Sequence, residues 1–414
     1  MINSINFNKN IKNRNVYTKL ITPLVFLTIM SIFFFIPIKI SGLGIRIDDI
    51  LILLCVPLIV LHIKYIKNEK YIYPILLFLS LVAMSMTYGY IVLDVPFSGG
   101  DINEFFRYSK ILLFAILLGY IDIHKLSNMT FKVFYYGSFY LIFVGFMQYF
   151  DPLSIGKYFS LLYTSESQIY TAIEHSVRRV TVTGSGPNDG AILVSYFMLF
   201  NFFTFVFTNN KKYLVLFILL IPVLFFTQSR TVIIGMFFAL SISFLLTKSF
   251  YAKKIFLTFL ISIFIIILFP LFSYIVIGIQ TALEGTNNSL LVRISHIETA
   301  YNLFVQSPFV GWGFAKSLYY DMRMDSEYLT IFYRFGIFGL LSAIWIIIMP
   351  VLYKKQFDKI KIIELKVYYY MLFAFSILGL FVMLTNSFIT GYQTFLGFIL
   401  LTVLSFRFLK QYKS

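Results

Sequence analysis

Long apolar runs separated by short polar gaps dominate this chain. A bilayer core of about 30 Å needs about 20 helical residues to cross it. Runs of about that length lie near 20–38, 48–64, 72–92, 105–121, 133–150, 190–207, 213–228, 231–247, 255–279, 329–351, 367–386 and 391–406. The pattern predicts an all-α polytopic membrane protein of about twelve transmembrane helices. We expect residues 1–414 to form a single integral membrane domain.

Two polar stretches, 151–189 and 280–328, are too long to be simple turns and are expected to be the larger outer loops. In the second, apolar residues from Leu290 to Val305 recur every three or four positions, which predicts an amphipathic helix along the membrane surface. Ser307-Pro308 ends it. On its helical wheel Arg293 and Glu298 border the apolar stripe and His296 lies on the polar side. We expect most of any reaction centre between 289 and 340.

Composition excludes a soluble domain, because 59% of residues are hydrophobic, 13% are charged and the mean hydropathy is +0.85. One cysteine, Cys55, leaves no disulfide and suggests no cysteine metal site. We therefore expect neither a metal nor another cofactor. The net charge of +16 is explained by membrane topology and by attraction to anionic lipid, so nucleic acid is not an expected partner.

Lysine and arginine are segregated along the chain. Lysines gather in one set of short connections, at Lys64, Lys67, Lys70, Lys211, Lys212, Lys248, Lys253, Lys254, Lys354, Lys355, Lys359, Lys361 and Lys366. By the positive-inside rule that face and both termini are cytoplasmic, which predicts a multi-pass protein of the cytoplasmic (inner) membrane. Arginines gather on the opposite face, at Arg46, Arg178, Arg179, Arg230, Arg293 and Arg323, with Arg107 and Arg334 just inside helices that begin there.

The arginines on the outer face need a cause other than topology, which lysine satisfies equally well. A guanidinium binds diphosphate in bidentate fashion, so an anionic substrate is one explanation. Ion pairing with the outer acidic residues is the other. Arg230 lies between two apolar runs, where a charge is costly unless it meets an anion. Arg178 and Arg179 precede a turn rich in Thr, Gly and Ser, whose remainder could equally be a docked hairpin or irregular loop.

Three motifs occur in order on the outer face: RVTVTGSGPNDGA before one span, FFTQSRTVIIG between two spans, and RISHIETAYNLFVQSPFVGWG followed by DSEYLTIFYRFGIFGLL. Together they resemble the O-antigen polymerase (Wzy) and O-antigen ligase superfamily. The resemblance implies a metal-independent membrane glycosyltransferase with a GT-C-like fold and two larger periplasmic loops. It implies as partners an undecaprenyl-diphosphate-linked oligosaccharide, membrane lipid, and a chain-length regulator and flippase of the same pathway for O-antigen or capsular polysaccharide.

One departure from the superfamily pattern favours the polymerase branch. Ligases, which transfer the finished chain to lipid A core, typically place a histidine beside Asn or Ser just before the penultimate motif helix. Here that position reads Asp325-Ser326-Glu327-Tyr328. A ligase is the first alternative. A lipid-linked oligosaccharide flippase is the second, but it would need charged groups inside the spans, and few occur here.

The expected reaction transfers a glycosyl chain from undecaprenyl diphosphate to an acceptor hydroxyl. Arg230 and Arg293, then Arg179, are expected to stabilise the departing diphosphate. Glu327 is the preferred candidate for the proton acceptor, and Asp325 or His296 is the alternative. Carboxylates at a helix start more often act as caps. Expected substrate-binding residues, taken together, are Arg178, Arg179, Asn188, Trp312, Arg323 and Arg334.

Overall fold

The computed structural model describes residues 21–36, 38–40, 43–62, 69–165, 168–173, 179–247, 284–285, 288–318, 324, 326–359 and 362–412. After a first helix, Ile21–Phe34, the elements in chain order are β1 (Ile38–Ile40), β2 (Leu43–Ile45), α2 (Ile47–His62), α3 (Ile72–Val92), α4 (Gly99–Gly119), α5 (Ile123–Phe150), η2 (Pro152–Ser154), α6 (Ile155–Tyr163), α7 (Ile169–Ile173), α8 (Pro187–Thr208), α9 (Lys211–Phe226), α10 (Arg230–Leu245), α12 (Asn288–Gln306), α13 (Glu327–Leu352), α14 (Lys354–Phe357), α15 (Ile363–Val382) and α16 (Tyr392–Gln411).

The all-α polytopic class is confirmed, with one short antiparallel hairpin, β1–β2, added to it. Within the described residues six helices are long and apolar enough to cross a membrane: Ile72–Val92, Ile123–Phe150, Pro187–Thr208, Glu327–Phe357, Ile363–Val382 and Gln393–Gln411. Each predicted apolar run coincides with a helix except 255–279, which lies outside the described residues. The run predicted to reach residue 386 ends as a helix at Val382.

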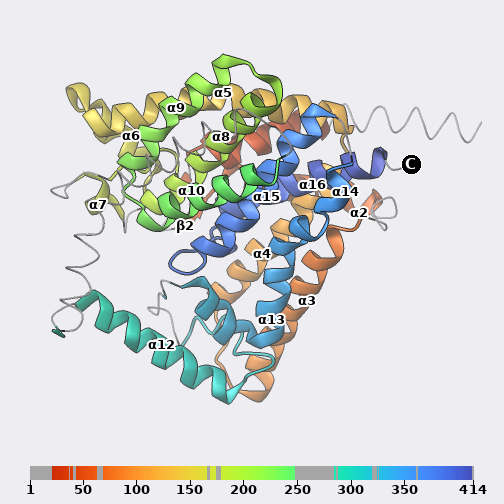
Figure 1. Cartoon of the computed structure of the whole chain (residues 1–414). Helices are drawn as coiled ribbons and strands as arrows, with labels where there is room; N and C mark the ends of the chain where they lie inside the picture. Colours follow the sequence, from red (N-terminus) through yellow and green to blue (C-terminus); the bar gives the residue numbers. More distant parts are fainter. Residues whose placement is uncertain are drawn as a thin grey trace, which may run out of the picture.

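Figure 1 shows α5, α6 and α9 in the upper half of the molecule and α3, α4 and α13 in the lower half, with α12 beside α13. Local signals start several of these helices. Asp122 accepts hydrogen bonds from the amides of His124 and Lys125 at the start of α5, and Asn210 accepts one from Lys212 at the start of α9. Pro187 opens α8, where its missing amide hydrogen costs nothing.

The two ends of the helix bundle differ in which positively charged side chains they hold. At one end Lys410 pairs with Glu69 at 2.8 Å, and Arg407 donates to the carbonyls of Leu118 and Ile121. Lys212, in the first turn of α9, also lies at the end of that helix opposite Phe226. Arg179 and Arg230 lie at the Phe226 end of the bundle. Arg179 and Arg230 thus lie at the opposite end of α9 from Lys212, whereas Arg407 lies near Lys410 in α16.

Arg46, one of the arginines expected on the outer face, contacts both acidic residues at the start of α2. The Nε of Arg46 pairs with Asp48 at 3.1 Å, while its backbone amide donates to Asp49 at 2.9 Å. Asp49 in turn pairs with Lys110 of α4. These contacts tie the start of α2 to α4 and to the end of the first helix.

The helix expected from Leu290 to Val305 is α12, and it packs on the first turns of α13. Phe304 stacks on Phe332 with ring centroids 3.7 Å apart, and the indole of Trp312 donates to the Leu303 carbonyl at 2.8 Å. Gly336 breaks α13 with φ of 65°, and a Cβ there would lie 2.3 Å from the Phe309 carbonyl oxygen. The turn after α12 therefore fits into a kink that only glycine allows.

Candidate functional site

A network of polar side chains joins three segments at the arginine-bearing end of the bundle. Its centre is Asn188, in the first turn of α8. The Oδ1 of Asn188 accepts hydrogen bonds from Arg179 Nη2 at 3.3 Å and from Ser229 Oγ at 2.8 Å. Its Nδ2 donates to Asn386 Oδ1 at 2.5 Å. One amide therefore links the segment before α8, the turn between α9 and α10, and the segment after α15.

The segment that carries Arg179 runs beside the end of α9. The Val180 amide donates to the Phe226 carbonyl at 3.0 Å, and Arg179 Nε donates to the Thr227 carbonyl at 3.2 Å. Because both contacts use backbone carbonyls of the α9–α10 turn, they fix Arg179 against the turn that presents Arg230.

Gln148 of α5 holds the same segment from the other side. Its Oε1 accepts from the Val182 amide at 2.7 Å, and its Nε2 donates to the Val182 carbonyl at 3.0 Å. This pair satisfies both backbone groups of a buried residue, as a neighbouring strand would. Val182 has φ of 52°, so the segment bends here and Gln148 stabilises the bend.

Gly190 lets this segment lie directly on α8. A Cβ at position 190 would lie 2.2 Å from the carbonyl oxygen of Thr181, a backbone atom that cannot move alone. Gly190→Ala is therefore expected to displace the segment that carries Arg179 and to lower the free energy of unfolding by about 1–3 kcal/mol, the usual cost of overpacking. The measurement is the thermal unfolding temperature of the purified membrane protein.

Gly99→Ala is the matched control for Gly190→Ala. Gly99 opens α4, and a Cβ there would meet no atom within 4 Å. It should unfold at the wild-type temperature. A wild-type unfolding temperature in Gly190→Ala would show that the close approach of this segment to α8 is not needed for stability.

Two arginines, Arg179 and Arg230, and the starts of α8 and α10 lie at or beside this network. Arg179 is half-buried, and Arg230, the first residue of α10, is exposed. Burial lowers the pKa of the Arg179 guanidinium below its usual value, and the charge of Arg230 lowers it further. An anion beside two like charges reduces their mutual repulsion.

The backbone adds to this preference for an anion. Helix α8 starts at Pro187 and α10 at Arg230, and neither has a hydrogen bond from its N-cap side chain to the first turn. The N-terminal end of a helix carries partial positive charge and amide donors. The nearby carboxylate of Asp189 accepts a hydrogen bond from the Ser185 hydroxyl. The two arginines and the two helix starts favour an anion here, whereas the Asp189 carboxylate does not.

The segment after α15 completes the network and is held by Glu327. Thr385 Oγ1 donates to Thr231 Oγ1 at 2.7 Å, which links this segment to α10. Glu327, 2% exposed, accepts hydrogen bonds at Oε2 from the amides of Phe388 at 2.6 Å and Ile389 at 2.9 Å. At Oε1 it accepts one from Thr390 at 2.5 Å. Glu327 begins α13, as expected from the sequence, and its buried carboxylate anchors the segment after α15.

Residues 214–344 match the model of a protein family described as O-antigen ligase. The match supports the O-antigen ligase and polymerase superfamily. It spans Ser229, Arg230 and Glu327 and leaves Arg179, Asn188 and Asn386 outside. The superfamily assignment supports an enzymatic role for a multi-pass membrane protein. It does not distinguish a ligase from a polymerase. No curated protein matches the chain.

Of the residues predicted from sequence, Arg179 and Asn188 are hydrogen-bonded in this network, and Arg230 directly follows Ser229 of the same network. Within the superfamily match, Arg293 lies in α12 but its side chain is outside the described set. Arg178, Arg323 and Asp325 also lie outside the described residues. Their roles stay predictions.

Three other predicted residues belong to the α12–α13 contact. Arg334 is 8% exposed, and its Nε donates to the Tyr333 hydroxyl at 3.0 Å. Trp312 donates to Leu303, as described above. His296 was expected on the polar side of α12, but it is half-buried, and no described residue hydrogen-bonds its Nδ1. None of the hydrogen bonds described for these three reaches the Asn188 network.

Ser229 and Asn386 are the members of the network that the sequence reading missed. Asn386 follows the apolar run of α15 within Leu384-Thr385-Asn386-Ser387, a polar cluster at the end of a span. That cluster is the available signal. Among the described residues, no three His, Cys, Asp or Glu side chains group as metal ligands would.

Proposed function

We propose that this protein polymerises undecaprenyl-diphosphate-linked oligosaccharide repeat units, of an O-antigen or a capsular polysaccharide, at the outer face of the cytoplasmic membrane. The observation that supports this proposal is that Arg179 and Ser229 both hydrogen-bond Asn188 in the first turn of α8, while Arg230 follows Ser229 at the start of α10. A lipid diphosphate is the anion that a glycosyl-transferring member of the superfamily would bind there as part of its substrate. This network lies away from the lysine-rich connections, which supports its placement at the outer face of the membrane.

The transfer breaks the bond between the anomeric carbon of the growing chain and its diphosphate oxygen. It forms a bond from that carbon to a hydroxyl oxygen on the non-reducing sugar of the next lipid-linked unit. The hydroxyl proton leaves to a base, and undecaprenyl diphosphate leaves with the bonding electrons. Arg179 and Arg230 stabilise the charge that grows on the diphosphate, so their binding strengthens toward the transition state.

Glu327, Asp325 and His296 were the expected proton acceptors. Both oxygens of Glu327 accept backbone amide bonds, so in this geometry it supports the network instead of facing an acceptor sugar. We propose that Glu327 positions Asn386 and thereby Asn188, while Asp325 or His296 stays the proposed base. Arg293 stays a proposed third contact to the diphosphate. The proposed transfer is independent of metal, so it should persist in a chelator.

A ligase is the second candidate, because the matched family is described as O-antigen ligase. The two activities use the same donor and differ in the acceptor. The lack of a histidine at Asp325-Ser326-Glu327 favours the polymerase.

One assay separates the candidates. Purified protein in liposomes receives synthetic lipid-linked repeat units, with and without lipid A core, and products are resolved by gel. A ladder of lengths without lipid A core is the expected result. A single product that requires lipid A core would establish the ligase. Transport of intact units across the liposome with no new glycosidic bond would establish a flippase and refute the proposal.

A further inference from the structure

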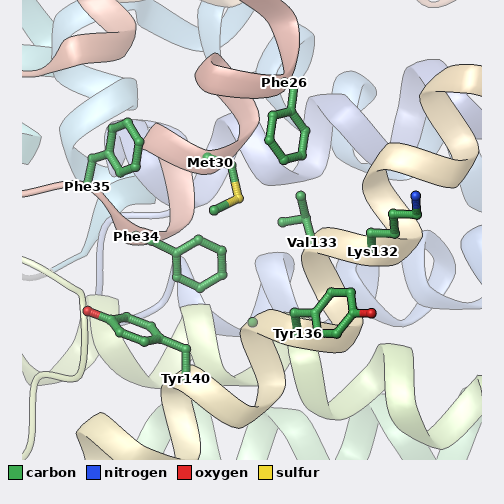
Figure 2. Close-up of a pocket in the computed structure, with 9 residues that line it drawn as sticks. Phe26, Met30, Phe34, Phe35, Lys132, Val133, Tyr136 and Tyr140 are labelled. Carbon is green, nitrogen blue, oxygen red and sulfur yellow. The ribbon is translucent and has the colours of Figure 1, made fainter. Parts of the chain in front are cut away.

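An apolar pocket of about 580 Å³ lies between the first helix, Ile21–Phe34, and α5, far along the sequence from the candidate site residues. Figure 2 shows Met30 near its centre, Phe26 and Lys132 toward one end and Tyr140 toward the other. Its volume is within the range of about 300–1,000 Å³ typical of small-molecule sites. We call it the α5 pocket.

Aromatic contacts give the α5 pocket a fixed wall at the Tyr140 end. A Cβ at Gly137 would lie 2.3 Å from Phe34 Cζ, so the absence of a side chain there lets Phe34 rest on α5. The ring of Phe34 meets that of Tyr140 edge to face, with centroids 5.5 Å apart. The Tyr140 and Tyr163 hydroxyls are hydrogen-bonded at 2.6 Å, and Tyr163 donates to the Phe34 carbonyl at 2.9 Å. Polar groups at this end are thus already satisfied.

The other end carries a cation. Lys132 is exposed, and it is the one charged side chain among the described residues that line the α5 pocket. No ion pair to Lys132 occurs in the described part of the chain. Next to it, Phe26 is 36% exposed and Tyr136 is 65% exposed. The surface therefore combines a long apolar wall with a positive charge at one end.

Position along α5 sets the depth of that charge. Lys132 precedes Gln148 by 16 residues (148 − 132), or about 24 Å at 1.5 Å per residue. Gln148 holds the Val182 segment of the candidate site. Because the bilayer core is about 30 Å thick, Lys132 lies toward the leaflet opposite that site. An anionic group bound at Lys132 is therefore not the diphosphate bound at Arg179 and Arg230.

We infer that the α5 pocket binds one anionic phospholipid of the leaflet opposite the candidate site. Its headgroup phosphate contacts Lys132, and one acyl chain lies along the aromatic wall toward Tyr140. Lysine near a membrane surface attracts anionic headgroups, and each buried methylene of an acyl chain adds to affinity. This inference does not depend on the reaction proposed above.

The test is native mass spectrometry of the full-length protein titrated with phosphatidylglycerol or with phosphatidylcholine of the same chains. The wild type should bind one phosphatidylglycerol more tightly than any phosphatidylcholine. Lys132→Gln should reduce phosphatidylglycerol affinity about five-fold and leave phosphatidylcholine binding unchanged. Met30→Trp fills the centre of the α5 pocket and should weaken binding of both lipids.

Lys125→Gln is the matched control, since Lys125 is exposed on the same helix, two turns before the α5 pocket. It should bind like the wild type. Equal loss in Lys125→Gln and Lys132→Gln would overturn the inference, because the preference would then belong to the surface in general. Preferential occupancy by added undecaprenyl phosphate would overturn it as well. Lys132→Gln is a surface change, so the test stands even where Met30→Trp fails to fold.

Discussion

Arg230→Lys and Arg179→Lys are each expected to lose most polymer while the protein still accumulates in the membrane. Lysine keeps the charge but loses the planar fork that binds two phosphate oxygens at once. The Arg179→Lys variant also loses the Nε and Nη2 donors that bind the Thr227 carbonyl and the Asn188 side chain. Removal of one charge-assisted contact in a water-poor site costs about 2–4 kcal/mol, or roughly 30- to 1000-fold in rate. Polymer length and yield in vesicles measure the loss.

Arg107→Lys provides the matched control for both arginine variants. Arg107 also lies at the arginine-bearing end, but it is 47% exposed and pairs with Glu104 at 3.3 Å. A surface ion pair contributes little, so its activity should remain within about two-fold of the wild type. Polymer of normal length from Arg230→Lys would remove Arg230 from the reaction. An equal loss in Arg107→Lys would show that general surface charge is what matters.

The helices were predictable because the backbone N–H and C=O groups of an apolar run must be hydrogen-bonded within the run, in lipid or in the bundle core. A helix does this whatever its neighbours are. The role of Arg230 stays a prediction, made because a lone charge between two apolar runs is costly without an anion. Asn386 was not predicted from the sequence. Its partner, Asn188, is 198 residues away, and the polar cluster around Asn386 marks the end of a span without indicating that partner.

The α5 pocket shows the same limit of sequence reading. Its walls come from residues about 100 positions apart, such as Phe34 and Gly137, and neither stands out in its own apolar run. Glu327 lies between these cases. The sequence placed it at the start of a span, but its partners, the amides of 388–390, depend on how α13 meets the end of α15.

Glu327→Gln is expected to weaken transfer strongly by loosening the segment that carries Asn386. A glutamine has one acceptor oxygen, and its amino group would face at least one of the three amide donors from Phe388, Ile389 and Thr390. Each hydrogen bond to a buried charge contributes about 1.5–3 kcal/mol, so we expect a loss of about 3 kcal/mol or more in stability. Thermal unfolding and hydrogen exchange of those three amides measure it, beside polymer yield.

These measurements separate an anchor from a proton acceptor. If Glu327 anchors the segment, activity should fall together with faster exchange at Phe388–Thr390, and Glu327→Asp, which keeps the charge, should recover part of both. If Glu327 accepted the proton, Glu327→Gln would abolish transfer with unchanged exchange and unfolding temperature. Glu298→Gln, on the exposed side of α12, is the control and should change neither quantity. Activity and amide protection should fall together because Asn188 hydrogen-bonds Asn386. The position of Asn386 depends on the three amides that Glu327 holds.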